Sequence, residues 1–155
     1  DLMLSQCCNC SEIVGVDFDE EAIEWAKNNV ENDKIKFLNK DFMGLDVFSN
    51  RGGCDCVLSL DVIEHIPQED EDKYLETVHK NLHEDGFTVI GTPNEKMYPY
   101  ASPWNKKAHI NNYSQERLYD LLNKRFKNVF IFGAYVGLFS NFFNISIYDS
   151  VGVFF

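Results

Sequence analysis

Short apolar runs alternate with amphipathic stretches along most of this 155-residue chain. Each run is only a few residues long, a length typical of strands rather than helices. They occur at residues 13–16, 35–38, 54–60, 87–91, 129–132 and 145–148, the last extending toward Phe155. The pattern therefore predicts a protein built around a β-sheet.

Three stretches between these runs carry apolar residues at helical spacing. Asp19 and Ser114 are suited to cap the first and third helices, and Glu20 and Glu21 complement the dipole of the first. Pro67 opens the middle helix, and Gly86 is expected to end it. The expected buried faces are Ile23, Ala26 and Val30; Leu75, Val78 and Leu82; and Leu118, Leu121 and Leu122.

Strands joined through helices pair in parallel, because a parallel neighbour needs a crossover connection. The order therefore predicts the α/β class, with a doubly wound, Rossmann-like, mostly parallel sheet in a single domain over residues 1–155. The last two strands have no helix between them and should form an antiparallel hairpin. Residues 1–11 could be a helix tail, and residues 95–112 are expected to be an irregular lid or substrate wall.

Polar residues cluster directly after several strands. Asp17 follows the first run, Asp41 and Phe42 lie just beyond the second, and Asp61, Glu64 and His65 follow the third. Thr92-Pro93-Asn94 breaks the fourth. Ligands in open α/β sheets bind outside the carboxyl ends of the strands, so these clusters indicate the functional edge.

Charge and cysteine content restrict the function further. The net charge of −11 opposes extended binding to a nucleic-acid backbone, although it permits a single nucleotide end or a small molecule. Five cysteines, two of them in a predicted strand, favour a reduced, cytoplasmic protein over a disulfide framework. Their spacing is not that of the common zinc modules. No apolar stretch approaches the ~20 residues of a membrane span.

Four segments in this order resemble the class I S-adenosylmethionine-dependent methyltransferases: IVGVDFDEEAIEWAKNN, NKDF, DCVLSLDVIEHI and DGFTVIGTPN, within residues 12–132. The resemblance implies S-adenosylmethionine as cofactor. It implies that Asp17 binds the ribose hydroxyls, Phe18 packs on the adenine, and Asp41 with the Phe42 amide binds the adenine edge. Ser59 and Leu60 occupy positions at which family members contact the cofactor by backbone and side chain.

One departure from the family pattern is large. The family's glycine-rich loop follows a first strand about twenty residues before residue 12, and this chain contains neither. We therefore expect a truncated N-terminus, and two strands with unpaired edges in place of a central strand. On this expectation the chain as given binds the cofactor weakly or not at all, while the full-length protein binds it.

The D-x-x-E-H pattern of Asp61, Glu64 and His65 can bring two carboxylates and an imidazole together if helical geometry begins there. Such a set suits Mg²⁺ or Mn²⁺, with the imidazole favouring a transition metal. It resembles two groups of O-methyltransferases with an acid-x-x-Glu-His metal site, acting on polyprenyl quinone precursors or on the 2′-hydroxyl at the 3′ end of small RNAs. In the second group a later histidine completes the site, and His109 is the candidate. Without a metal, Glu64 and His65 would orient the substrate or act as a base.

The leading hypothesis is thus a methyltransferase that modifies an oxygen or nitrogen of a small molecule, sugar or nucleotide end, with oxygen favoured. A non-catalytic binding module with a truncated methyltransferase fold is the alternative. A nicotinamide-dependent Rossmann oxidoreductase is a third hypothesis, since it would use the same acidic residue after its second strand. The methyl acceptor and the oligomeric state are not predicted.

Overall fold

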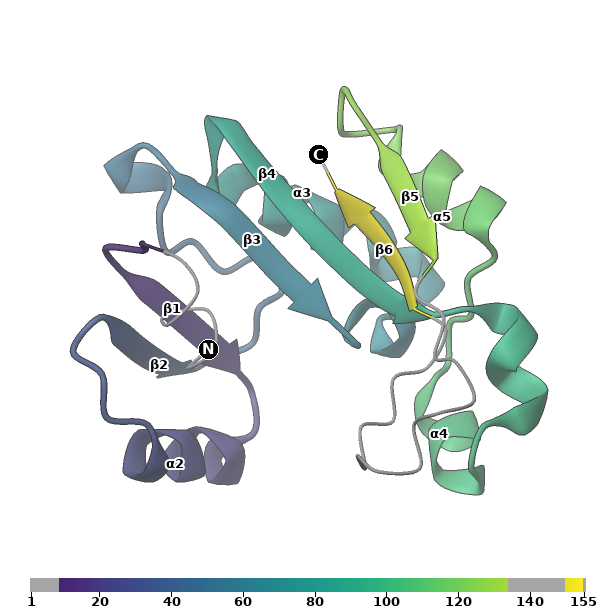
Figure 1. Ribbon diagram of the computed structural model, residues 1–155, viewed down its shortest axis with the longest axis horizontal. Helices are drawn as coiled ribbons and strands as arrows, with labels where there is room; N and C mark the ends of the chain where they lie inside the picture. Colours follow the sequence, from purple (N-terminus) through teal and green to yellow (C-terminus); the bar gives the residue numbers. More distant parts are fainter. Residues whose placement is uncertain (1–8, 134–149, 155) are drawn as a thin grey trace. The chain divides into compact units, whose positions relative to one another are not determined.

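The computed structural model describes residues 9–133 and 150–154 (Figure 1). The chain divides into two compact units, Asp1–Leu45 and Asp46–Phe155, which we describe separately. The predicted strand over residues 145–148 and most of the predicted helix tail lie outside the described residues. The expectation that a first strand and a glycine-rich loop are missing is not tested by the described residues and stays a prediction.

The first unit is a β–α–β element. Strand β1 (Ile13–Asp17) pairs in parallel with β2 (Ile35–Asn39), and α2 (Glu20–Asn29) connects them. Asp19 caps α2 as predicted, because its Oδ1 accepts hydrogen bonds from the amides of Glu21 and Ala22 at 2.9 and 3.4 Å. The two strands are in register from Ile13 opposite Ile35 to Asp17 opposite Asn39, so both end at the same edge.

The second unit contains a four-stranded sheet in the order β3-β4-β6-β5. These strands are β3 (Cys54–Leu60), β4 (Leu82–Pro93), β5 (Phe130–Gly133) and β6 (Ser150–Phe154). The β3–β4 pair is parallel, and β6 runs antiparallel to both β4 and β5. The parallel crossover and the antiparallel C-terminal hairpin are thus confirmed.

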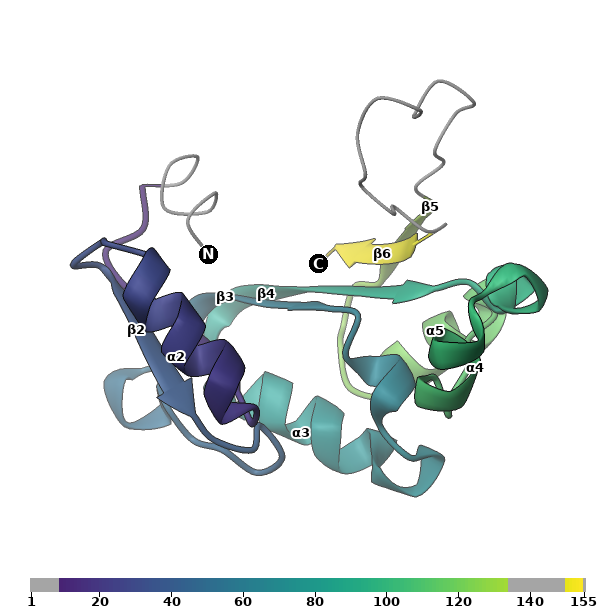
Figure 2. The same cartoon turned by 90° about the horizontal axis from the view of Figure 1, so that it is seen from below.

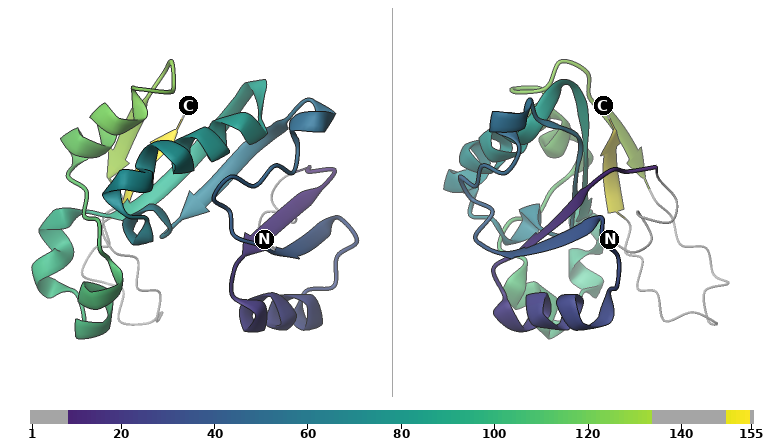
Figure 3. Two further views of the ribbon diagram at one scale, coloured as in Figure 1. Left: turned by 180° about the vertical axis from the view of Figure 1, so that it is seen from behind. Right: turned by 90° about the vertical axis from the view of Figure 1, so that its left-hand side faces the viewer.

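Helix α3 (Glu71–Asn81) crosses from β3 to β4 and covers one face of these strands (Figures 2 and 3). Tyr74, Leu75 and Val78 on its inner side are fully buried. Burial of a large apolar side chain contributes about 1.5–3 kcal/mol, so this face of α3 is a main source of the unit's stability. Three short 3₁₀ turns precede the helix: Ser49–Arg51, Ile63–His65 and Gln68–Asp70.

The predicted end of this helix at Gly86 was wrong. Helix α3 ends at Asn81, whose Oδ1 accepts hydrogen bonds from the amides of Val47 and Phe48 at 2.8 and 3.2 Å. Leu82, expected on the helix face, begins β4 instead. Gly86 lies inside β4, where a Cβ would be only 2.9 Å from the carbonyl oxygen of Cys54. Its small size therefore permits close approach of β3 to β4 and does not mark a helix end.

The expectation of an irregular segment over residues 95–112 was also wrong. It contains a 3₁₀ helix (Glu95–Tyr100) and α4 (Pro103–Ala108). Asn94 caps the first through the amide of Lys96, and the Ser102 hydroxyl caps the second through the amide of Asn105. Pro103 occupies the first turn of α4, where the missing N–H has no intrahelical partner to lose.

Helix α5 (Gln115–Leu122) forms where predicted. The Ser114 hydroxyl accepts a hydrogen bond from the amide of Arg117 at 3.1 Å, and the predicted face of Leu118, Leu121 and Leu122 is buried. Within residues 9–133 and 150–154, every helix is too short or too polar to cross a membrane. Of the five cysteines, Cys10, Cys54 and Cys56 lie in this part of the chain, and Cys10 and Cys54 are free thiols.

Candidate functional site

The carboxyl ends of β3 and β4 meet at one edge of the second unit. Leu60 lies opposite Gly91 in this parallel pair, and the amide of Asp61 donates a hydrogen bond to the Gly91 carbonyl oxygen at 2.9 Å. Asp61 has a φ of 54°, in the left-handed region that aspartate tolerates better than most residues. The chain therefore turns sharply as it leaves β3 and enters the 3₁₀ turn Ile63–His65.

Glu64 is a buried carboxylate in this turn, with 1% of its surface exposed. Its Oε2 accepts a hydrogen bond from the Thr92 hydroxyl at 2.9 Å. Its Oε1 is buried without a hydrogen-bond partner among the described residues. Burial raises the pKa of the Glu64 carboxyl, while the Thr92 hydroxyl and a backbone hydrogen bond oppose this increase. A buried acceptor without a donor is costly, so a bound cation would stabilise it.

His65 follows Glu64 and is half-exposed. Its Nδ1 lies 3.0 Å from the Ala108 carbonyl oxygen. A carbonyl only accepts hydrogen bonds, so Nδ1 carries the proton and the neutral ring keeps a lone pair on Nε2. This Nε2 lies 4.0 Å from Glu64 Oε1. The imidazole lone pair and the unpartnered carboxylate oxygen are therefore close to one another.

His109 comes from the end of α4 and meets His65 edge to face, with ring centroids 5.0 Å apart and planes inclined at 79°. Burial, and next the nearby His65, lower the pKa of His109, which favours its neutral form at neutral pH. Glu64, His65 and His109 each offer one ligand atom, and these three atoms all lie within 4.8 Å of one another. We call these three residues the Glu-His-His cluster.

Asp61 is not a member of this cluster. Its side chain is exposed on the left-handed turn, although its charge raises the pKa values of both Glu64 and His109. The structure thus brings together three of the four residues expected to bind a metal. One carboxylate and two imidazoles form a mixed oxygen and nitrogen donor set, which suits Mn²⁺ and other first-row transition metals.

The cofactor residues predicted in the first unit share one sheet edge. Asp17 ends β1, and its Oδ1 accepts a hydrogen bond from the Asp19 amide at 2.9 Å. Asp41 follows β2, and its Oδ1 accepts one from the Met43 amide at 2.8 Å. Both carboxylates are exposed, Phe42 is half-buried, and Phe18 has 82% of its surface exposed.

Ser59 and Leu60 have opposite environments, because successive side chains of a strand point to opposite faces. The Ser59 hydroxyl is buried and accepts a hydrogen bond from the Tyr74 hydroxyl of α3 at 2.6 Å. Leu60 is 54% exposed. Ser59 can therefore offer a ligand its backbone, whereas Leu60 can also offer its side chain.

Two features of the site were missed in the sequence. Thr92, interpreted only as part of a strand break, donates the hydrogen bond that holds Glu64. The ends of parallel neighbouring strands lie at one sheet edge, and this was the sequence signal that Thr92 could lie near Glu64. Glu71, which the sequence analysis did not single out, is buried and bonded to residues 111–117. Nothing local in the sequence indicates that contact.

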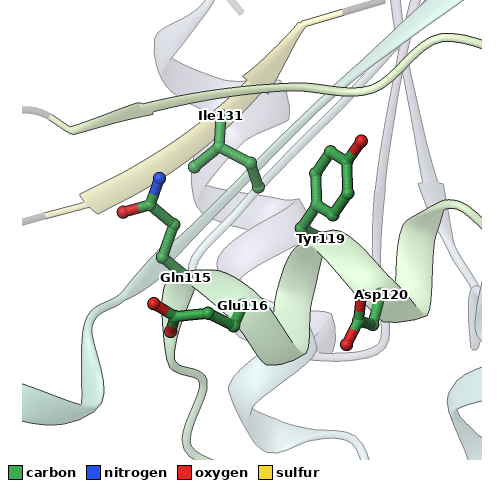
Figure 4. A pocket seen from close by; sticks show the side chains of 5 residues that line it. All are labelled: Gln115, Glu116, Tyr119, Asp120 and Ile131. Carbon is green, nitrogen blue, oxygen red and sulfur yellow. The ribbon is translucent and has the colours of Figure 1, made fainter.

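A separate surface hollow of about 540 Å³ lies between α5 and β5. Figure 4 shows its lining: Gln115, Glu116, Tyr119 and Asp120 from α5, and Ile131 from β5. None of the predicted site residues lines it, so the Glu-His-His cluster and this hollow are distinct features.

Three solved structures with the same fold are distant from this chain in sequence. A structure of the Haloferax volcanii Trm112 methyltransferase activator in complex with a methyltransferase is 13% identical (TM-score 0.72, covering 98% of this chain and 74% of that one). The methyltransferase domain of bacterial CtHen1 is 16% identical (TM-score 0.68, covering 99% and 81%). Magnesium protoporphyrin IX methyltransferase from Synechocystis PCC 6803, with bound SAM, is 14% identical (TM-score 0.63, covering 92% and 58%). At these identities the likeness shows the fold alone.

No curated protein sequence matches this chain. A family model does: the methyltransferase domain model matches residues 2–86, more than half of the 155 residues. This match decides against the nicotinamide-dependent oxidoreductase hypothesis. The chain belongs to the methyltransferase domain family, and its fold is that of the class I S-adenosylmethionine-dependent methyltransferases.

Proposed function

We propose that this methyltransferase transfers the methyl group of S-adenosylmethionine to a hydroxyl oxygen of a small molecule, sugar or nucleotide end. In this proposal the Glu-His-His cluster holds a divalent cation beside the acceptor. The single observation that carries it concerns Oε1 of Glu64: this atom is buried, has no hydrogen-bond partner among the described residues, and lies 4.0 Å from the Nε2 of His65.

The residues for the cofactor are those at the edge of the first unit. Asp17 engages a backbone amide through Oδ1 and is exposed, so its carboxylate is accessible to two ribose hydroxyls. The exposed ring of Phe18 offers an apolar face to the adenine. Asp41 is exposed as well and can accept a hydrogen bond from the adenine amino group. In the second unit, the exposed Leu60 side chain and the Ser59 backbone stay predicted cofactor contacts.

The cluster is suited to hold a cation without a large rearrangement. The Nδ1–H of His65 is held by the Ala108 carbonyl, which leaves Nε2 as its ligand atom. Burial lowers the His109 pKa, so this imidazole is neutral and able to coordinate. Thr92 holds one oxygen of Glu64, and the other is left for the cation. Glu64 contributes the only negative charge among the three residues.

The chemistry of O-methylation requires that the acceptor hydroxyl lose its proton as the new carbon–oxygen bond forms. When bound, S-adenosylmethionine supplies an electrophilic methyl group, and a divalent cation lowers the pKa of a hydroxyl that it coordinates. Glu64, His65 and His109 would hold that cation, solvent water would accept the hydroxyl proton, and S-adenosylhomocysteine would be the leaving group. Proximity of the two reactants does most of the remaining work.

A second candidate mechanism needs no metal. The half-exposed His65 keeps a lone pair on Nε2, and the adjacent Glu64 carboxylate would stabilise the imidazolium that forms when His65 accepts the hydroxyl proton. The same residues are used in both mechanisms, so a metal titration separates them.

Isothermal titration with S-adenosylhomocysteine tests the cofactor assignment. Asp17→Ala and Asp41→Ala should each weaken binding about tenfold or more, because each removes a charge-assisted hydrogen bond. Asp33→Ala, which removes an exposed aspartate of the same unit, is the matched control and should leave the affinity unchanged. Equal affinities for all four proteins would show that these carboxylates do not hold the cofactor.

Mn²⁺ titration, followed by electron paramagnetic resonance, tests the cation. One Mn²⁺ should bind, and Glu64→Gln or His109→Ala should each lower the affinity at least tenfold. Methyl transfer that persists in a chelator while His65→Ala abolishes it would favour the metal-free mechanism. Failure of the full-length protein to bind either the cofactor product or a metal would instead favour the non-catalytic binding module.

A further inference from the structure

A second group of polar side chains is buried between the start of α3 and residues 111–117, and it takes no part in the proposed chemistry. Its centre is Glu71, the first residue of α3, which is only 8% exposed. The Oε1 atom of Glu71 accepts hydrogen bonds from Asn111 Nδ2 and from the Tyr113 hydroxyl, both at 2.7 Å. It also accepts one from the guanidinium of Arg117, whose carbon lies 4.4 Å above the Tyr113 ring centroid.

Asn111 links this group to the site. Its side-chain amide also donates to the Ile66 carbonyl oxygen at 3.1 Å, and its Oδ1 accepts a hydrogen bond from Arg117 at 2.8 Å. Its backbone amide donates to the carbonyl oxygen of Glu64 at 3.1 Å. The donors and the acceptor of the Asn111 side chain are therefore all engaged, which leaves this residue a single arrangement.

His109 lies between two cross-links that join its segment to the turn that carries Glu64 and His65. On one side of His109, the Ala108 carbonyl accepts from His65 Nδ1 at 3.0 Å. On the other side, Asn111 bonds to the Glu64 carbonyl. His109 itself donates its backbone amide to Asn105 in α4. The position of its ring relative to His65 therefore depends on where Asn111 is held.

We propose that Glu71 is a positioning residue of the site: through Asn111 it sets the His109 ring against Glu64 and His65. Among the described residues, no hydrogen bond or ion pair joins Glu71 to either ring or to a ligand atom of the Glu-His-His cluster. It acts by gathering three donors from residues 111–117 onto one oxygen, which fixes the segment after His109 to the start of α3. The metal-binding consequence rests on the proposed function, whereas the placement of His109 does not.

The direct test is the nuclear Overhauser effect between the ring protons of His65 and His109 in the metal-free protein. The chain has four histidines, so selective isotope labelling gives a simple spectrum. The wild-type protein should show the cross-peak, and Glu71→Gln should lose or strongly weaken it. Glu76→Gln, which makes the same change at an exposed position of α3, should retain it.

Folding must be separated from positioning, because the neutral glutamine leaves Arg117 without its charged partner. Cross-peak intensities are therefore compared at a temperature at which thermal melts show every variant to be folded. If Glu71→Gln does not fold, Tyr113→Phe replaces it: this variant keeps the ring beneath Arg117 and removes one donor to Glu71. A folded variant that melts earlier yet keeps the full cross-peak would overturn the proposal and leave Glu71 a purely structural role.

Co²⁺ binding, followed by absorption spectroscopy, tests the metal-binding consequence, which depends on the proposed function. Glu71→Gln should lower Co²⁺ affinity about tenfold, the lower range for residues that support metal ligands. In a His109→Ala background the same substitution should lower it no further. If the wild-type protein binds no Co²⁺, the proposed metal site fails, and the histidine cross-peak still decides the positioning role of Glu71.

Discussion

The Thr92 hydroxyl donates a hydrogen bond to Oε2 of Glu64 at 2.9 Å, which joins the end of β4 to the turn that follows β3. Both side chains are buried, with exposed fractions of 0% for Thr92 and 1% for Glu64. The bond holds one carboxylate oxygen and leaves the other, Oε1, directed to no hydrogen-bond donor among the described residues. This asymmetry leaves one oxygen of Glu64 available to a ligand, and the first two predictions below depend on it.

Removal of the Glu64 charge should stabilise the metal-free protein at neutral pH. Burial raises the pKa of Glu64 in the folded protein above its ordinary value of 4.5, so ionisation is harder in the folded state than in the unfolded one. Stability attributable to this carboxyl is therefore full below about pH 4.5 and is lost as the pH rises through the raised pKa. In urea unfolding, the free energy of unfolding of Glu64→Gln should exceed that of the wild type. The difference should be absent in acid and should grow to a plateau as the pH rises. A difference that shrinks as the pH rises would contradict this.

Replacement of Thr92 by valine should destabilise the protein by about 1–3 kcal/mol, the cost of leaving a buried partner without its hydrogen bond. Valine nearly matches threonine in shape, so the loss is mainly that of the donor to Glu64. The same substitution in the Glu64→Leu background, where no carboxylate needs a donor, should cost clearly less. Equal costs in both backgrounds, measured by urea unfolding, would show that Thr92 acts independently of Glu64.

The buried hydrogen bond from Tyr74 to Ser59 should be structural. Tyr74→Phe and Ser59→Ala should each destabilise the protein by about 1 kcal/mol, and the double variant by less than their sum, because the two hydroxyls serve one another. Since the Ser59 hydroxyl faces α3, Ser59→Ala should leave S-adenosylhomocysteine affinity unchanged. A tenfold weaker affinity in the calorimeter would mean that this hydroxyl does contact the cofactor.

Two adjacent glycines should differ sharply in their tolerance of alanine. Gly52 and Gly53 have φ values of +85° and +90°, so alanine at either position incurs the left-handed backbone penalty of about 1–2 kcal/mol. At Gly53 a Cβ would also lie 2.2 Å from the backbone nitrogen of His83, whereas at Gly52 nothing lies within 4 Å. Gly53→Ala should therefore lower the free energy of unfolding by several times as much as Gly52→Ala. Similar losses in a thermal melt would refute the close approach of this turn to β4.

The amino-acid sequence by itself determined the alternation of strands and helices, the caps at Asp19 and Ser114, and the polar residues at the strand ends. These features depend on near neighbours in the chain: a periodic apolar face, a hydroxyl or carboxylate before a helix, a polar residue after a strand. The pairing of Glu64 and His65 with His109 was also predicted, from resemblance to a methyltransferase subgroup.

Only the tertiary structure decided how those residues are used. Asp61 lies on a left-handed turn and is not part of the Glu-His-His cluster, in which its spacing had placed it. The Tyr74 hydroxyl donates a hydrogen bond to the Ser59 hydroxyl. Gly86 permits the close approach of β3 to β4, and helix α3 ends at Asn81. Glu71 finds Asn111 forty residues away. Each of these outcomes depends on which distant group fills a buried position, and a local pattern carries no information about that group.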